Sequence, residues 1–272
     1  MADSPHPVSR LGPLIATGRT ADVHAWDDGR VVKLMLPQFG EAQAREEAVA
    51  ARLAAHADIG APAFDGVVTV GDRSGLVYER IDGLPMTVAL AGRPWMVRVL
   101  AARFGDLHAA VHGADAPGLP DVRELLAGAI RSADVDAGAR RAALRRLEGM
   151  PAGSALLHGD MHPANVLTTA DRPRIIDWIQ GARGAPAADV ARTLFLLRDS
   201  GVEPDRSARE RLVIGVLRRA FASAYLRAYR RARPLDLSEI RAWRLPVLVA
   251  RLAEGIVHER ARLERLIRSE LT

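Results

Sequence analysis

The amino-acid sequence predicts an α+β protein of two lobes, in which a small antiparallel sheet with one helix precedes a larger, mainly helical part. Up to Arg80, short apolar runs alternate with turn signals, whereas from Pro94 onward apolar residues recur at helical spacing over long segments. A turn-rich interruption from Pro151 to about Pro186 divides the helical part. Segments of this kind, held between regular elements, often carry function.

The N-terminal lobe is expected to consist of hairpins around a single helix. Asp27–Gly29 is a strong hairpin turn, and Gly71–Gly75 joins a second pair of strands. Between the hairpins, Gly40–Ala57 has helical spacing, and Ala61–Pro62 ends it. The predicted strands are Leu14–Ala16, Ala21–Trp26, Arg30–Leu34, Val67–Val70 and Leu76–Arg80.

The segment Ile81–Pro85 is predicted to be a short linker between the lobes. It divides the chain into an N-terminal lobe, residues 1–81, and a C-terminal lobe, residues 82–272. The C-terminal helices are expected at Pro94–His112, Val122–Ala133, Asp136–Glu148, Asp189–Asp199, Ser207–Arg233 and Leu237–Leu271, with a bend in the last near Pro246.

Composition excludes several classes of protein. The chain has no cysteine, which rules out disulfides and thiolate metal sites. The N-terminus lacks the apolar core of a signal peptide, and charged residues interrupt every apolar run before it reaches the length of a membrane span. These features predict a cytoplasmic protein with no membrane partner.

The net charge of +5 does not indicate a nucleic-acid partner. Only 4% of residues are aromatic, and no cluster of basic residues is interleaved with them as single-strand binding requires. The excess arginine is better explained by solvated helix faces.

Two residue types occur only once, and their positions are informative. Among 38 basic residues Lys33 is the only lysine, and Asn165 is the only asparagine in the chain. Arginine cannot replace lysine where a compact point charge is needed, and aspartate cannot replace asparagine where a neutral amide is needed. Both positions are therefore expected to have roles that the commoner residue cannot fill.

The interruption holds residues suited to phosphoryl transfer. Asp160 and Asn165 are five residues apart, and Asp177 follows a second short apolar run twelve residues later. Phosphoryl transfer needs a carboxylate to take the proton of the attacking hydroxyl, oxygen ligands for Mg²⁺ and a cation on the phosphates. Asp160 suits the first role, Asn165 and Asp177 the second, and Lys33 the third.

The segment His158–Asn165, followed by Ile176–Trp178, resembles the catalytic motifs of the aminoglycoside phosphotransferase and choline kinase-like superfamily. The resemblance implies the two-lobed protein-kinase-like fold, with Asp160 as catalytic base and Asn165 and Asp177 as magnesium ligands. Gly184–Ala191 resembles the segment that follows in this family, where Asp189 is expected to be structural.

The resemblance extends to the N-terminal lobe. Gly18–Val23 is similar to the loop that covers the nucleotide phosphates, with Gly18 and Thr20 as binding positions, and Val31–Lys33 is similar to the strand that carries the phosphate lysine. A helix carboxylate should orient that lysine; Glu46 is favoured because it lies seven residues before Leu53, with Glu47 as the alternative.

Tyr78–Gly83 resembles the hinge between the lobes, where Glu79 and Ile81 would bond the nucleotide base through main-chain atoms. The expected cofactors are ATP, or GTP, and Mg²⁺. The N-terminal lobe is then the nucleotide-binding lobe, and the helical lobe carries the catalytic loop and the acceptor site.

The sequence therefore predicts an ATP-dependent small-molecule kinase that transfers the γ-phosphate to a hydroxyl of a metabolite, a sugar or an aminoglycoside-like antibiotic. A catalytically inactive nucleotide-binding module of the same fold is the alternative. Acids such as Asp199, Glu203, Asp205, Glu254 and Glu259 could form a subsite for a cationic acceptor. His108 and His112 lie four residues apart on a predicted helix, but without an evident third ligand they are expected to be ordinary core or surface histidines. The sequence leaves the oligomeric state open.

Overall fold

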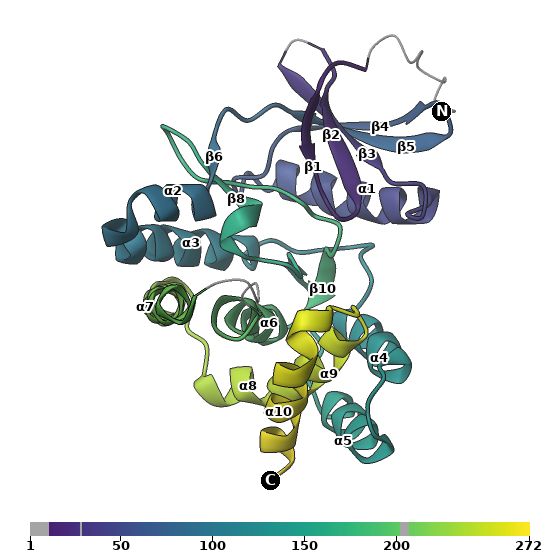
Figure 1. Cartoon of the computed structure of the whole chain (residues 1–272). Coiled ribbons are helices and arrows are strands. Elements are labelled where there is room, and N and C mark those ends of the chain that lie inside the picture. The colour runs from purple at the N-terminus through teal and green to yellow at the C-terminus, as the bar shows by residue number, and fades with distance from the viewer. Residues whose placement is uncertain (1–10, 28, 202–206) are drawn as a thin grey trace.

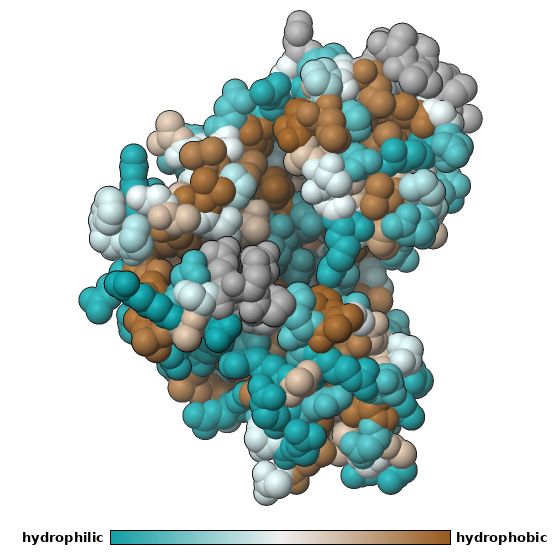
Figure 2. Space-filling model, in the orientation of Figure 1, coloured by the Kyte–Doolittle hydropathy of each residue, from teal (hydrophilic) through white to brown (hydrophobic). Residues whose placement is uncertain are grey.

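The computed structural model describes residues 11–27, 29–201 and 207–272 (Figure 1). It confirms the α+β class, because a five-stranded antiparallel sheet with one helix lies above a larger, mainly helical part. The surface is indented between these two parts on the face that Figure 2 shows.

The sheet has the strand order β1-β2-β3-β5-β4, and every neighbouring pair is antiparallel. Gly29 has a φ of 77° in the turn between β2 and β3, a conformation that glycine adopts without steric cost, while Asp28 of the predicted turn lies outside the described residues. The strands are β1 (Leu14–Thr17), β2 (Ala21–Ala25), β3 (Arg30–Met35), β4 (Phe64–Val70) and β5 (Arg73–Glu79).

The helix α1 (Glu41–His56) covers one face of this sheet. Its small residues Ala44, Ala48 and Ala51 pack against Met35 and Leu76, so the backbone of the helix approaches the strands closely. A smaller apolar cluster covers the other face, and it comprises Trp26, Val32, Leu34, Val68, Val70 and Val77. Strand β3 therefore turns Val32 and Leu34 to one face and Lys33 to the face of α1.

The helical part begins with α2 (Met86–Gly92). The two helices that pack most extensively against each other are α3 (Val97–Val111) and α7 (Ala208–Ala232). Gly105 is required where they meet, since a Cβ there would lie 2.6 Å from the carbonyl oxygen of Tyr225. The remaining helices are α4 (Val122–Ser132), α5 (Ala137–Glu148), α6 (Pro186–Arg198), α8 (Leu237–Ala242), α9 (Arg244–Leu252) and α10 (Arg260–Leu271).

The predicted single helix from Leu237 to Leu271 is wrong, because α8, α9 and α10 replace it. Pro246 lies in the first turn of α9. Backbone N–H groups in the first turn have no helical acceptor, so proline costs no hydrogen bond at this position. The chain instead turns after α9 at Gly255, whose φ is 67°, before the short 3-10 helix η4 (Val257–Glu259).

Short strands, most of them too short to show a pattern in the sequence, hold the interruption in place. Strand β7 (Ala155–Leu157) pairs with β10 (Ala182–Gly184), and β8 (Val166–Thr168) pairs with both β6 (Leu84–Pro85) and β9 (Arg174–Ile175). The loop from His158 to Asn165 is thus fixed between β7 and β8, and it ends in the 3-10 helix η3 (Pro163–Asn165).

None of the described helices combines the length and apolarity needed to cross a bilayer. Residues 1–10, for which the sequence predicts no signal peptide, lie outside the described part of the chain.

Candidate active site

Lys33 lies at the centre of a polar cluster that joins the two parts of the molecule. Its Nζ donates to Oε1 and Oε2 of Glu47 at 2.7 and 2.8 Å, and to Oδ1 of Asp177 at 2.6 Å. These contacts use all three protons of the ammonium group. A residue of the sheet, a residue of α1 and a residue that follows β9 are thereby held together.

The partner of Lys33 is Glu47, so the prediction of Glu46 is wrong and the alternative is right. Glu47 is 1% exposed, whereas Glu46 is an exposed residue on the outer side of α1. Glu47 shares the buried face with Ala44 and Ala51, at the spacing of three and four residues that defines one side of a helix. Leu53, the reference for Glu46, is only half-buried and does not mark that face.

The electrostatics of the cluster favour a charged lysine. Burial opposes the charge, but the carboxylates of Glu47 and Asp177 outweigh it and raise the pKa of Lys33 above its ordinary value. Tyr78 donates its hydroxyl proton to Oε1 of Glu47 at 3.0 Å, which fixes the carboxylate further.

The predicted catalytic loop is shaped by His158 and Gly159. His158 is fully buried; its Nε2 donates to the carbonyl oxygen of Ile176 at 3.1 Å, and its Nδ1 accepts from the N–H of Asp160 at 3.2 Å. Burial lowers the pKa of His158, so the ring is neutral and joins the loop to the segment that ends in Asp177. Gly159 has a φ of 76°, and a Cβ there would lie 2.3 Å from the carbonyl oxygen of Gln180.

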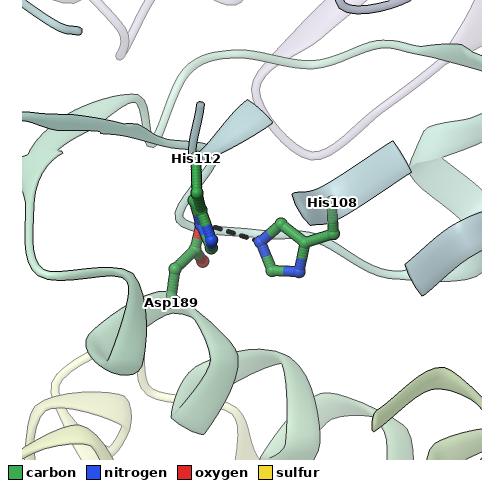
Figure 3. Close-up of side chains that lie close together, drawn as sticks. All are labelled: His108, His112 and Asp189. Carbon is green, nitrogen blue, oxygen red and sulfur yellow. Dashed lines mark hydrogen bonds and ion pairs between the residues drawn. The ribbon is translucent and has the colours of Figure 1, made fainter. Parts of the chain in front are cut away.

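Asp189 of α6 supports the same loop from below, as the sequence predicts for a structural residue. Its Oδ2 accepts from the N–H of His158 at 2.7 Å, and its Oδ1 accepts from the N–H of Gly159 at 3.2 Å. Figure 3 shows that His108 and His112 both face this carboxylate, and the Nε2 atoms lie 3.2 and 3.3 Å from Oδ2.

His108 and His112 are buried core residues, and Asp189, which the sequence pattern did not link to them, is the third side chain of their cluster. With Asp189 they form a group of three side chains of types that can bind a metal ion. One potential ligand atom from each lies within 4.8 Å of the other two. Each Nδ1 faces a tyrosine hydroxyl, at 2.9 Å for Tyr225 and 2.6 Å for Tyr229. Every ring nitrogen thus has a hydrogen-bond partner without an ion, and the cluster is a buried hydrogen-bond network.

This network predicts a specific loss of stability in acid. Burial lowers the pKa of His112 to about 4. Below about pH 6.5 the unfolded chain binds a proton that the folded chain refuses, so the free energy of unfolding falls as the pH falls towards 4. At pH 5 this contribution amounts to about 2 kcal/mol.

The variant His112→Gln should lose that dependence, and denaturant unfolding at pH 7 and pH 5 measures it. The exposed His56→Gln serves as the control and should keep the wild-type difference between the two pH values. Equal pH dependence in the His112→Gln variant and the wild type would show that His112 is not held neutral.

Asp160, the predicted base, has a different donor near each carboxylate oxygen. Its Oδ2 lies 3.4 Å from Nε2 of His162, and its Oδ1 lies 3.6 Å from Nη2 of Arg192. Nδ1 of His162 accepts from the N–H of Ala164 at 3.3 Å, so the proton sits on Nε2 and faces Asp160. Burial raises the pKa of Asp160, but His162 and Arg192 outweigh it and hold the pKa well below its usual range.

Asn165 and Asp177 are brought to the same end of the β8–β9 hairpin. The N–H of Ile176 donates to the carbonyl oxygen of Asn165 at 3.0 Å, which ties the backbone just before Asp177 to the backbone of Asn165. Nδ2 of Asn165 donates to the carbonyl oxygen of Asp160 at 3.0 Å, so its Oδ1 is turned the other way and accepts from no described residue. Asp177 adopts a φ of 69°, a conformation uncommon for residues other than glycine and typical of functional sites.

The other predicted positions lie in the turn between β1 and β2 and at the end of β5. Gly18 and Thr20 lie in the turn between β1 and β2, where the N–H of Gly18 already donates to the carbonyl oxygen of Ala21 at 2.8 Å. The N–H of Glu79 donates to Ala63, whereas the N–H of Ile81 has no acceptor in the described segments. Glu79 can therefore offer only an acceptor from its main chain, and Ile81 can offer a donor.

Comparison with known proteins decides the family. The model of the phosphotransferase enzyme family matches residues 14–235 of this chain. The chain belongs to this family. The resemblance found in the catalytic motifs is therefore confirmed, and so is the prediction of a phosphotransferase with an alcohol group as acceptor. The comparison with curated proteins gave no match.

Several solved structures share the fold of this chain. An amicoumacin kinase in complex with AMP-PNP and Ca²⁺ aligns with a TM-score of 0.66 at 15% identity, over 96% of this chain and 88% of that one. A choline/ethanolamine kinase family protein from Mesorhizobium loti aligns with a TM-score of 0.62 at 19% identity, over 96% and 87%. An aminoglycoside-3'-phosphotransferase of type VIII aligns with a TM-score of 0.58 at 20% identity, over 86% and 90%.

Proposed function

We propose that this phosphotransferase is an ATP-dependent kinase that transfers the γ-phosphate to a hydroxyl group of a small molecule, with Asp160 as the base. The observation that carries the proposal is the cluster in which Lys33 contacts both Glu47 and Asp177. It brings a phosphate-binding cation to a residue suited to bind a metal. Asp160 and Asn165 lie on one short loop, linked by the hydrogen bond from Nδ2 of Asn165.

The residues present fit a magnesium ion. Magnesium prefers oxygen ligands and usually keeps several waters and substrate phosphates in its shell. Asn165 would contribute its uncommitted Oδ1 and Asp177 its carboxylate, and the bound ion would neutralise charge on the phosphates. The amicoumacin kinase structure, which holds AMP-PNP and Ca²⁺, supports a nucleotide and a divalent cation in this fold.

The N-terminal lobe, residues 1–81, would then bind the nucleotide. The main chain at Glu79 and Ile81 would bond the base, and the N–H of Ile81, which has no acceptor among the described residues, supports this assignment. Gly18 and Thr20 would lie over the phosphates, and Lys33, kept charged by its two carboxylates, would hold them. ATP is the proposed nucleotide, with GTP as the alternative that the same main-chain groups allow.

Asp160 would take the proton of the acceptor hydroxyl as the new bond to phosphorus forms. Its low pKa keeps it ionised, and His162 and Arg192 orient the two oxygens. The acceptor would bind in the C-terminal lobe, residues 82–272, of a cytoplasmic enzyme.

The described charges disfavour a polycationic acceptor. Asp199 pairs with Arg262 at 2.5 Å, Glu254 pairs with Arg192 at 2.8 Å, and Glu259 pairs with Arg251 at 2.8 Å. The charge of each of these acids, which the sequence suggested for a cationic subsite, is thus already balanced by an arginine. Glu203 and Asp205 lie outside the described residues. A neutral or anionic metabolite, sugar or natural product is therefore preferred to an aminoglycoside.

The test is transfer of labelled γ-phosphate from Mg-ATP across a panel of hydroxylated compounds that includes neutral sugars, sugar acids, macrolides and aminoglycosides. The proposal predicts a phosphorylated product from at least one neutral or anionic member. Tight nucleotide binding with no transfer to any acceptor or to water would favour the inactive nucleotide-binding module instead.

A further inference from the structure

Arg192 is a half-buried cation next to the proposed base, and no motif in the sequence singled it out. It lies on α6, three residues after Asp189, and its side chain is 13% exposed. Its Nη2 lies 2.8 Å from Oε1 of Glu254 and 3.6 Å from Oδ1 of Asp160, and its Nε has no hydrogen-bond partner in the described part of the chain.

The two distances differ in meaning. At 2.8 Å the contact between Arg192 and Glu254 is a close ion pair, whereas 3.6 Å from Arg192 to Asp160 is too long for a hydrogen bond. Arg192 therefore acts on Asp160 through its charge alone. The lone pairs of Oδ1 stay available for a proton, while Oδ2 faces the Nε2–H of His162.

Glu254 is itself held from several sides. Its Oε2 accepts from Nη1 of Arg251 at 2.5 Å, and Arg251 is anchored in turn by the buried carboxylate of Glu259 at 2.8 Å. Arg19, in the turn between β1 and β2, approaches the same Oε2 at 3.8 Å. The turn after α9 thus presents Glu254 at a fixed place opposite Arg192.

We infer that Arg192 is a positioning residue for Asp160, and that Glu254 is the anchor that keeps its guanidinium close to the base but out of hydrogen-bonding contact with it. This inference rests on the proposed function of Asp160. Without Arg192 the carboxylate would lose the charge that orients Oδ1. Without Glu254 the guanidinium would be free to move onto Oδ1 and occupy the lone pair that the acceptor's proton needs.

The test compares Arg192→Met, Glu254→Gln and the double variant with the wild type, by ADP release from Mg-ATP with water or the best panel compound as acceptor. Each single variant should lower kcat by about tenfold or more, with the KM for Mg-ATP unchanged. Because Glu254 acts through Arg192, the double variant should be no slower than Arg192→Met alone.

Arg140→Met is the matched control. Arg140 is also half-buried and also has a buried Nε without a hydrogen-bond partner among the described atoms, but it lies in α5 and bonds the carbonyl oxygens of Ala133 and Val135. Its kcat should equal that of the wild type. If Arg192→Met does not fold, as judged by its melting temperature and AMP-PNP binding, the nearly isosteric Glu254→Gln still gives the answer.

Wild-type kcat in Glu254→Gln or in a folded Arg192→Met would overturn the inference, and so would losses that multiply in the double variant. An equal loss of kcat in Arg140→Met would overturn it as well, because the loss would then reflect a general disturbance of the helical part. If the wild type itself releases no ADP with any acceptor, the proposed function fails first and this inference with it.

Discussion

The variant Asp160→Asn is expected to lower kcat for phosphate transfer by about 10²–10⁴-fold, the range that a general base contributes. The amide has nearly the same shape but cannot take a proton from the acceptor hydroxyl. The KM for Mg-ATP should change little, because Asp160 is not among the residues proposed to bind the nucleotide. Steady-state kinetics with the best acceptor from the panel measure both quantities.

Asp171→Asn is the matched control for this experiment. Asp171 is an exposed aspartate in the turn between β8 and β9, close in sequence to the site, and it accepts a hydrogen bond from Thr169 of its own turn. Its kcat should stay at the wild-type value. Transfer at an undiminished rate by Asp160→Asn would remove Asp160 from the role of base.

The variant Lys33→Arg should lower kcat by about 10²-fold or more, the cost typical of removing one well-placed donor to the reacting phosphates. The space of Lys33 is set by contacts of 2.6 to 2.8 Å with Asp177 and Glu47. A planar guanidinium is larger than an ammonium group and cannot keep these contacts without displacing a carboxylate.

The reverse exchange on the same strand provides the comparison. Arg30 lies at the exposed start of β3 and pairs with Asp65, so Arg30→Lys should leave both kcat and the KM for Mg-ATP unchanged. Kinetics of both variants, with melting temperatures to confirm folding, give the result. An active Lys33→Arg would contradict the reading that the single lysine is kept for its compact charge.

The sequence predicts candidate site residues where local spacing and residue type determine the chemistry. The spacing of five residues from Asp160 was enough to predict Asn165. The single occurrence of lysine was enough to predict Lys33. The choice between Glu46 and Glu47 failed because it was referred to Leu53, which is only half-buried. The small residues Ala44 and Ala51 mark the buried face of α1 and would have selected Glu47.

Contacts between distant segments could not be predicted from local patterns. Arg192 is one arginine among many, and only tertiary packing brings it to Asp160 on one side and to Glu254 on the other. The same holds for Asp189, whose carboxylate meets His108 and His112 from a different helix. Periodicity alone also missed the breaks around α9, because Pro246 suggested a bend inside a helix that in fact begins two residues before it.

A crystal structure with AMP-PNP and Mg²⁺ tests the central claim most directly. We expect the metal between Oδ1 of Asn165 and the carboxylate of Asp177, Nζ of Lys33 against phosphate oxygens, and the terminal phosphate directed towards Asp160. A nucleotide bound elsewhere, or a metal that contacts neither Asn165 nor Asp177, would contradict it.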